Sequence, residues 1–394
     1  MLFRRLSKLV LPALFALQGA AVADPITFWD ETQRGANSFN HAPPDAAYFA
    51  ALADTGATWV RLVFSKWDSR SRDFLIGNAD AYDGLVAADL EVLRAVLDRA
   101  HAADIAVVLT PLTLPGNRWI QQNDGNFDDR LWSDPAYAPQ VARFWQDLAG
   151  ELGKHPALVA YNLLNEPVPE RATGLAENSP LSDYQRWQIE HQGSPRDLPA
   201  LYRQIIAAIR EVNAEMPIML DAGYYANPRA LATWPEPMED DRVLYSIHMY
   251  EPYAATSPQN VKRETPLRYP GTQINYAGEE QVWGRQEVAA HLQIGFDWAA
   301  ANNVPPSRVV LSEFGCMRRW QDCGTYLRDV IDAAEAANVH WAYYAFREDE
   351  WDGMDYELPA TLPPGRFYWL SETGKADQLP RDGELMNVLK SYMQ

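Results

Sequence analysis

The sequence predicts a single (β/α)8 barrel of the TIM type, from the number of its short apolar segments and the helical segments between them. The helical segments carry apolar residues spaced by three and four; clear examples are residues 87–104, 199–215, 285–303 and 323–339. The short segments are rich in β-branched and apolar residues: 35–40, 59–64, 105–112, 158–166, 218–223, 243–250, 309–315 and 340–346. Alternating strands and helices indicate a parallel sheet, and a parallel barrel closes with eight strands. A doubly wound open sheet is the alternative, but no glycine-rich phosphate loop follows the first strand.

The first residues of the chain have the pattern of a secretory signal peptide. Three basic residues precede a short apolar run, and the tripeptide that ends at Ala23 matches an A-x-A cleavage site. Pro12 and Gln18 interrupt the run, which disfavours a membrane anchor. We therefore expect residues 1–23 to be removed on export to the periplasm or the exterior. Residues 24–394 then form one barrel domain, since no linker or repeat divides them.

The charge balance bears on the partners of the protein. The chain has 34 Lys and Arg against 53 Asp and Glu, a net charge of −19, and loss of the three basic residues in 1–23 makes it −22. Such a surface repels nucleic acid and anionic membranes. We expect a monomer that handles a neutral substrate.

Polar groups gather where the predicted strands end. The fourth and seventh strands each end near a glutamate, Glu166 in "NEP" and Glu313 in "SEFG". In a parallel barrel the chemistry lies at the carboxyl ends of the strands. Two facing carboxylates are what glycoside hydrolysis needs, one protonated and one ionised. A lone strand-end glutamate is often a solvated loop residue, but other strands bring further polar groups to the same end: Asn165, His248, Tyr250 and Arg61.

These motifs resemble those of glycoside hydrolase family 5, the cellulase family, whose barrels use two glutamates. The resemblance spans roughly residues 35–346. It implies a retaining β-glycosidase with Glu166 as the acid/base and Glu313 as the nucleophile, and it implies no cofactor.

The resemblance also implies roles for the neighbouring polar residues. Asn165 would bind the sugar 2-hydroxyl, and Arg61 would support the nucleophile. In "HMY", His248 would lie next to the acid/base and Tyr250 against the nucleophile.

Two positions depart from the family pattern. Leu112 stands where the third strand of the family offers a histidine, which removes one expected contact to a sugar hydroxyl. Tyr344 stands where the eighth strand offers a tryptophan platform, and Trp341 lies three residues earlier. Because sugar rings stack on aromatic faces, we expect Trp341 and Tyr344 to contact substrate. We expect the same of Trp320 and Trp351, which follow the seventh and eighth strands.

The two cysteines, Cys316 and Cys323, are expected to form a disulfide in an exported chain. No ligand spacing indicates zinc. The acidic run 347–357 is interpreted as a solvated loop in preference to a calcium site, so no metal is expected.

The sequence thus indicates a secreted or periplasmic retaining β-glycosidase that cleaves a neutral oligo- or polysaccharide of the glucan or mannan type. One alternative is a family member that acts on a glycolipid or another aglycone-bearing β-glycoside, with its pocket shaped by residues 170–196 and 253–283. A non-catalytic carbohydrate-binding barrel is a further alternative, against which both glutamates argue.

Overall fold

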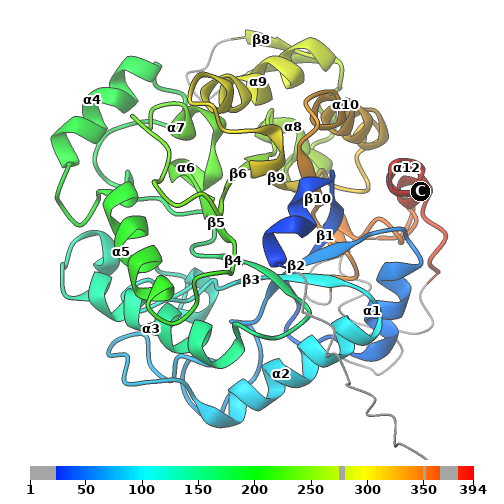
Figure 1. The fold of residues 1–394 in the computed structure, drawn as a ribbon. Coiled ribbons are helices and arrows are strands. Elements are labelled where there is room, and N and C mark those ends of the chain that lie inside the picture. The colour runs from blue at the N-terminus through cyan, green and yellow to red at the C-terminus, as the bar shows by residue number, and fades with distance from the viewer. Residues whose placement is uncertain (1–23, 275–279, 349–351, 364–379) are drawn as a thin grey trace, which may run out of the picture.

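The computed structural model of the protein describes residues 24–274, 280–348, 352–363 and 380–394. Eight parallel strands close into a barrel in the order β1-β10-β9-β6-β5-β4-β3-β2, and helices surround it (Figure 1). This architecture confirms the predicted (β/α)8 fold. The expected signal peptide, residues 1–23, lies outside the described residues, as does Trp351.

Each predicted strand segment contains or overlaps one barrel strand. These are β1 (Arg34–Ser38), β2 (Trp59–Val63), β3 (Ala106–Thr110), β4 (Leu158–Asn162), β5 (Ile218–Asp221), β6 (Val243–Met249), β9 (Val309–Phe314) and β10 (His340–Tyr343). The sequence did not predict the antiparallel hairpin of β7 (Gly271–Ile274) and β8 (Glu280–Trp283), which lies outside the barrel.

Long amphipathic helices pack their apolar faces on the outside of the barrel. The described helices are α1 (Ala46–Ala53), α2 (Ala87–Ala102), α3 (Tyr137–Leu152), α4 (Leu181–His191), α5 (Leu198–Arg210), α9 (Arg285–Ala301), α10 (Cys323–Ala336) and α12 (Glu384–Met393), with single turns α6 (Gly223–Ala226), α7 (Pro228–Leu231) and α8 (Tyr253–Thr256). Most of the buried apolar side chains form one continuous core.

A short 3-10 helix, η1 (Pro25–Asp30), closes the amino-terminal end of the barrel. Its Trp29 is fully buried, contacts the ring of Trp59 edge to face, and donates from Nε1 to the carbonyl of Val159 at 3.0 Å. Gly35 leaves room for the Trp59 ring, because a Cβ there would lie 2.7 Å from it. Buried aromatic side chains therefore fill this end of the barrel.

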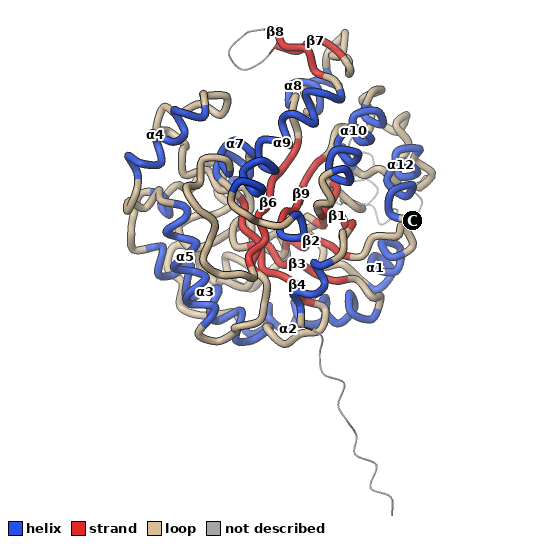
Figure 2. Tube along the Cα trace, turned by 45° about the horizontal axis from the view of Figure 1, so that its top comes forward, coloured by secondary structure: helices blue, strands red, loops and turns tan. Residues whose placement is uncertain are grey.

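The carboxyl ends of the strands carry the longer connections. The loop after β4 holds α4, and the loop after β6 holds α8 and the β7–β8 hairpin, which projects beyond α8 (Figure 2). Within the described part of the chain, no helix combines the length and the apolar character needed to cross a bilayer.

Candidate active site

Two glutamates face each other at the carboxyl end of the barrel. Glu313 lies in β9 beside His248 of β6, and Glu166 follows β4 with a left-handed backbone, φ 47°. A carboxylate oxygen of each glutamate and a ring nitrogen of His248 all lie within 4.8 Å of one another. Residues from three strands thus converge on one point, as the barrel topology requires.

Arg61 of β2 is the cation at the centre of this group. Its side chain is fully buried, and Nη1 donates to Glu313 Oε1 at 2.5 Å. Nη2 donates to Asn165 Oδ1 at 2.7 Å, and both Nη2 and Nε donate to Asn162 Oδ1. The planar guanidinium therefore holds Glu313, the candidate nucleophile, and the amide of Asn165 in one hydrogen-bond network.

Two buried residues of this hydrogen-bond network, Asp221 and Asn162, were not singled out from the sequence. Asp221 ends β5 and is fully buried; its Oδ2 accepts from the Glu166 amide at 3.1 Å and lies 3.3 Å from Arg61 Nη2. Asn162 donates from Nδ2 to Asp221 Oδ1 at 2.9 Å. An aspartate that closes the apolar strand "IMLD" was the available signal for this role.

His248 and Tyr250, from the end of β6, each contact one glutamate. His248 Nδ1 lies 2.8 Å from Glu166 Oε1, and the Tyr250 hydroxyl donates to Glu313 Oε2 at 2.8 Å. Burial lowers the pKa of His248, which favours a neutral ring next to Glu166.

The two glutamates have different electrostatic surroundings. Burial, together with the negative charge of Asp221, raises the pKa of Glu166 to about 8, although Arg61 acts against this shift. Burial also raises the pKa of Glu313, but there Arg61 and the hydrogen bond from Tyr250 act to lower it. Glu166 is thus the carboxyl that stays protonated near neutral pH, and Glu313 is the one whose contacts stabilise the carboxylate.

A family model described as cellulase, glycosyl hydrolase family 5, matches residues 23–350. The chain belongs to glycosyl hydrolase family 5. Among curated relatives, it is 23% identical over 253 residues to endoglucanase 3 of Fibrobacter succinogenes, and 24% identical over 229 residues to endoglucanase C of Acetivibrio thermocellus. These alignments cover 56% and 58% of this chain, but only 35% and 56% of the respective relatives.

Solved structures share the family 5 fold over nearly the whole chain. A hyperthermophilic endo-beta-1,4-glucanase in complex with substrate aligns with a TM-score of 0.58 and 18% identity, covering 89% of this chain and 100% of that one. Thermotoga maritima Cel5A in complex with mannotriose aligns with a TM-score of 0.62 and 16% identity, covering 93% and 100%.

The two departures from the family 5 pattern lie side by side. Leu112 is buried in a small apolar cluster with Phe39 and Val63, against which Tyr344 packs. Tyr344 lines the cavity at the glutamates, and its hydroxyl donates to Glu348 Oε2 at 3.0 Å. A tyrosine and an aliphatic side chain thus stand where the family pattern has a tryptophan and a histidine.

Trp320 and Trp341, two of the aromatic residues expected at the substrate, are buried and do not line the cavity at the glutamates. Trp320 is 2% exposed, and its Nε1 donates to the carbonyl of Leu267 at 2.8 Å. Trp341 is fully buried, and its Nε1 donates to Glu335 of α10 at 2.8 Å. Both rings are core residues, and Trp351, the third predicted platform, lies outside the described residues.

A cavity of about 760 Å³ opens at the two glutamates. At one end it is lined by Phe39, Lys66, Trp119, Tyr344 and Glu348, from the loops after β1, β2, β3 and β10. At the other it is lined by Glu177, Tyr225, Asn227, Glu251 and Tyr253, from the loops after β4, β5 and β6. We call these the β10 end and the β5 end of the cavity.

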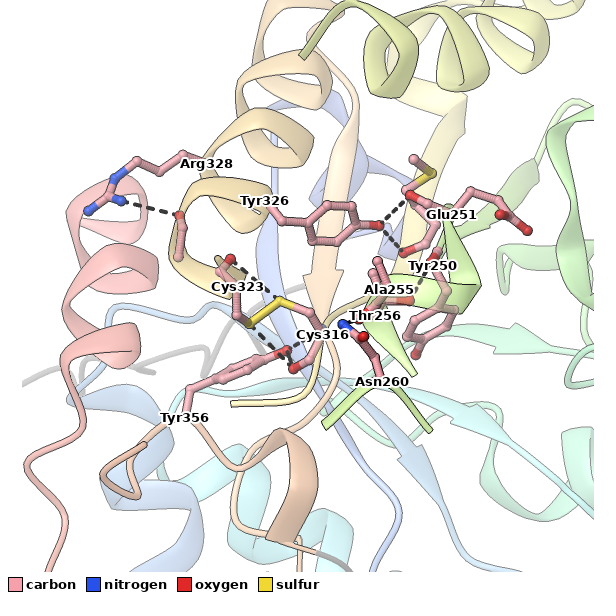
Figure 3. The surroundings of a disulfide bond; sticks show 12 residues. Tyr250, Glu251, Ala255, Thr256, Asn260, Cys316, Cys323, Tyr326, Arg328 and Tyr356 are labelled. Atoms are coloured by element: carbon pink, nitrogen blue, oxygen red, sulfur yellow. Dashed lines mark hydrogen bonds between the residues drawn. A yellow bond between two sulfur atoms is a disulfide. The ribbon is translucent and has the colours of Figure 1, made fainter. Parts of the chain in front are cut away.

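The predicted disulfide joins Cys316 and Cys323, whose Cα atoms are 5.7 Å apart (Figure 3). Both residues are fully buried. The bridge ties the loop after β9, three residues beyond Glu313, to the first turn of α10. Tyr356 braces the same loop, since its hydroxyl accepts from the Cys316 amide at 2.9 Å.

Among the described residues, Glu166, His248 and Glu313 form the one group with the geometry to hold a metal ion. Arg61 and Tyr250 already occupy the Glu313 oxygens, so this group fits proton chemistry better than a cation. The described part of the acidic run 347–357 is not a solvated loop: Glu348 and Asp355 are buried, and Arg347 pairs with Glu357 at 2.6 Å. Local ion pairs explain these charges.

Proposed function

We propose that this protein is a retaining β-glycosidase that cleaves a β-linked glycan of the glucan or mannan type, with residues 24–394 as its catalytic domain. The observation that carries the proposal is the pair Glu166 and Glu313: carboxylate oxygens of the two lie within 4.8 Å of each other, and only Glu313 accepts hydrogen bonds from Arg61 and Tyr250. Retaining glycosidases have carboxyl groups about 5–5.5 Å apart, whereas inverting enzymes need room for a water between them. Family membership and the endoglucanase relatives give independent support.

In the proposed first step, Glu313 attacks the anomeric carbon while Glu166 donates its proton to the leaving oxygen. Arg61 and Tyr250 hold Glu313 for attack. The side-chain amide of Asn165, held through its oxygen by Arg61, can offer its nitrogen to the sugar 2-hydroxyl. In the second step Glu166, now ionised, takes a proton from water, and the new oxygen displaces Glu313.

The proposal is tested by following product stereochemistry and two variants. Proton NMR of the first-formed product should show the β-anomer. Glu313→Ala should abolish formation of the glycosyl-enzyme. Glu166→Ala should still form it from an aryl β-glycoside with a good leaving group, and added azide should restore turnover. An α-anomer would overturn the mechanism, and full activity in Glu313→Ala would overturn the assignment of the site.

We also propose that residues 1–23 are a signal peptide and that the mature chain begins at Asp24. Asp24 caps η1 through the Ile26 amide, and both of its carboxylate oxygens accept from Arg242, at 2.5 and 2.7 Å. The barrel thus has defined contacts from Asp24 onward. N-terminal sequencing of exported protein should return Asp24 as the first residue.

A further inference from the structure

The β5 end of the catalytic cavity, beside Glu166, is rich in negative charge. What this end binds is inferred from the proposed acid/base function of Glu166. Burial raises the pKa of Tyr253, and the carboxylates of Glu166 and Glu177 raise it further. Glu166 likewise acts on Glu177. Glu166 follows β4, and the loops after β4, β5 and β6 line this end of the cavity. This end therefore lies on the acid/base side of the scissile bond, where the leaving group binds.

Two carboxylates in this wall, Glu177 and Glu251, have no cationic partner in the part of the chain that the structure describes. Neither forms an ion pair with a lysine, arginine or histidine anywhere in residues 24–274, 280–348, 352–363 and 380–394. Glu177 accepts from Asn227 Nδ2 at 3.1 Å, and Glu251 accepts from the Tyr253 amide at 3.0 Å. Burial and the charge of Glu251 raise the pKa of Glu177 to about 7, so the two carboxylates repel each other. We call them the carboxylate pair.

Two cations near this end have other contacts. Arg229 donates from Nη2 to the carbonyl of Ser179 at 2.8 Å. Arg171 lowers the pKa of Tyr225, which burial raises. Its guanidinium stacks on the ring of Phe127 and lies 3.9 Å from Asp129. By contrast, the carboxylate Glu348 at the β10 end has Lys66 at 4.0 Å. Among the described residues, a bound cation would therefore neutralise carboxylates at the β5 end and not at the β10 end.

The same wall exposes two aromatic rings, a second and independent feature. Tyr225 is 41% exposed and Tyr253 is 45% exposed, and both line the cavity. Tyr224, next to Tyr225 in the chain, is itself held, because its hydroxyl donates to the carbonyl of Leu175 and its amide donates to Glu170. Exposed aromatic faces beside a catalytic site bind sugar rings and attract cations. We call Tyr225 and Tyr253 the tyrosine pair.

We propose that the leaving-group subsite takes a sugar with a positive charge, an amino sugar whose amine is protonated. Its ring would bind against the tyrosine pair, and its ammonium group would donate to the carboxylate pair. With a neutral sugar of the same shape, a proton rather than a group of the ligand would offset the negative charge of Glu177 and Glu251. The subsite therefore selects the amino sugar through charge, and the glycone side of the cavity plays no part in that choice.

Glycosyl transfer tests this subsite separately from hydrolysis. An aryl β-cellobioside loads the enzyme, and an acceptor sugar then competes with water. The acceptor hydroxyl loses its proton to Glu166, its oxygen bonds to the anomeric carbon, and the bond from that carbon to Glu313 breaks. Equal concentrations of glucosamine and glucose are offered at about pH 7, where most of the amine is protonated. Mass spectrometry should show about tenfold more transfer to glucosamine, the effect of one charge-assisted hydrogen bond.

The matched variant carries Glu177→Gln and Glu251→Gln, which keep the shape of the side chains and remove both charges. It should still release the aryl group and transfer to the two acceptors within about twofold of each other. Glu348→Gln, at the β10 end of the cavity, is the control and should keep the tenfold ratio. Equal transfer by the unaltered protein, or no transfer to glucosamine, overturns the inference while leaving hydrolysis intact. No release of the aryl group would overturn the proposed function and this inference with it.

Discussion

At the scale of single residues, one arginine determines where the negative charges of the site can lie. Arg61 is fully buried and contacts Glu313, Asp221 and three amide side chains. A buried arginine is tolerated only when its charge and its donors are matched, and these five partners provide the match. Asp221 has two further effects on Glu166: it accepts a hydrogen bond from the Glu166 amide, and its negative charge raises the pKa of the Glu166 carboxyl.

We expect Asp221→Asn to move the basic limb of the pH–rate profile to lower pH. Glu166 must be protonated in the first step, so activity falls as the pH rises through its pKa, which is about 8. Asp221 helps to raise that pKa, and removal of its charge therefore lowers it. A shift of about one unit in the basic limb of kcat/KM is the expected size for a nearby charge.

Glu170→Gln is the matched control for this prediction. Glu170 is a buried carboxyl near the same end of the barrel, and burial raises its pKa to about 7, but it lines a different cavity. Its substitution should leave the basic limb where it is. A basic limb that stays fixed in Asp221→Asn would show that Asp221 serves only to position the Glu166 backbone.

At the scale of elements, strand alternation explains which sequence predictions succeeded. Side chains alternate between the two faces of a strand, so residues separated by an odd number of positions face opposite ways. Tyr344 reaches the cavity, and Trp341, three residues earlier, packs outward on α10. The β7–β8 hairpin was missed because its residues are mostly exposed, which leaves little apolar pattern.

The disulfide belongs to this scale, since it links the end of β9 to the start of α10. Its closed loop is short, and the chain-entropy relation gives a stabilisation of about 2–3 kcal/mol. Reduction should therefore lower the melting temperature by several degrees in calorimetry. The chain has only two cysteines, so the variant Cys316→Ala with Cys323→Ala should melt lower and show no response to reductant. Equal melting temperatures with and without reductant would contradict this.

At the scale of the whole molecule, the sequence predicted the barrel and its catalytic candidates but not the contacts that unite them. Glu166 and Glu313 could be chosen because each ends a strand with a recognisable motif. Asp221 and Asn162 act through partners on other strands, 59 residues apart in one case and 160 in the other. Such matches depend on barrel closure, which brings β2, β4 and β5 together and which no local pattern encodes.

The two ends of the barrel have separate tasks, and Trp29 allows this to be tested. It fills the amino-terminal end, opposite the glutamates, with no exposed surface. Trp29→Ala should lower the free energy of unfolding by about 3–5 kcal/mol, from lost burial and an internal cavity. Well below its melting temperature, the variant should keep kcat/KM within about twofold, because stability depends on this end and chemistry on the other.

Phe28→Ala, in the same 3-10 helix but only partly buried, is the control and should destabilise the fold less. A large loss of kcat/KM in folded Trp29→Ala protein would show instead that packing at the closed end sets the geometry of the glutamates.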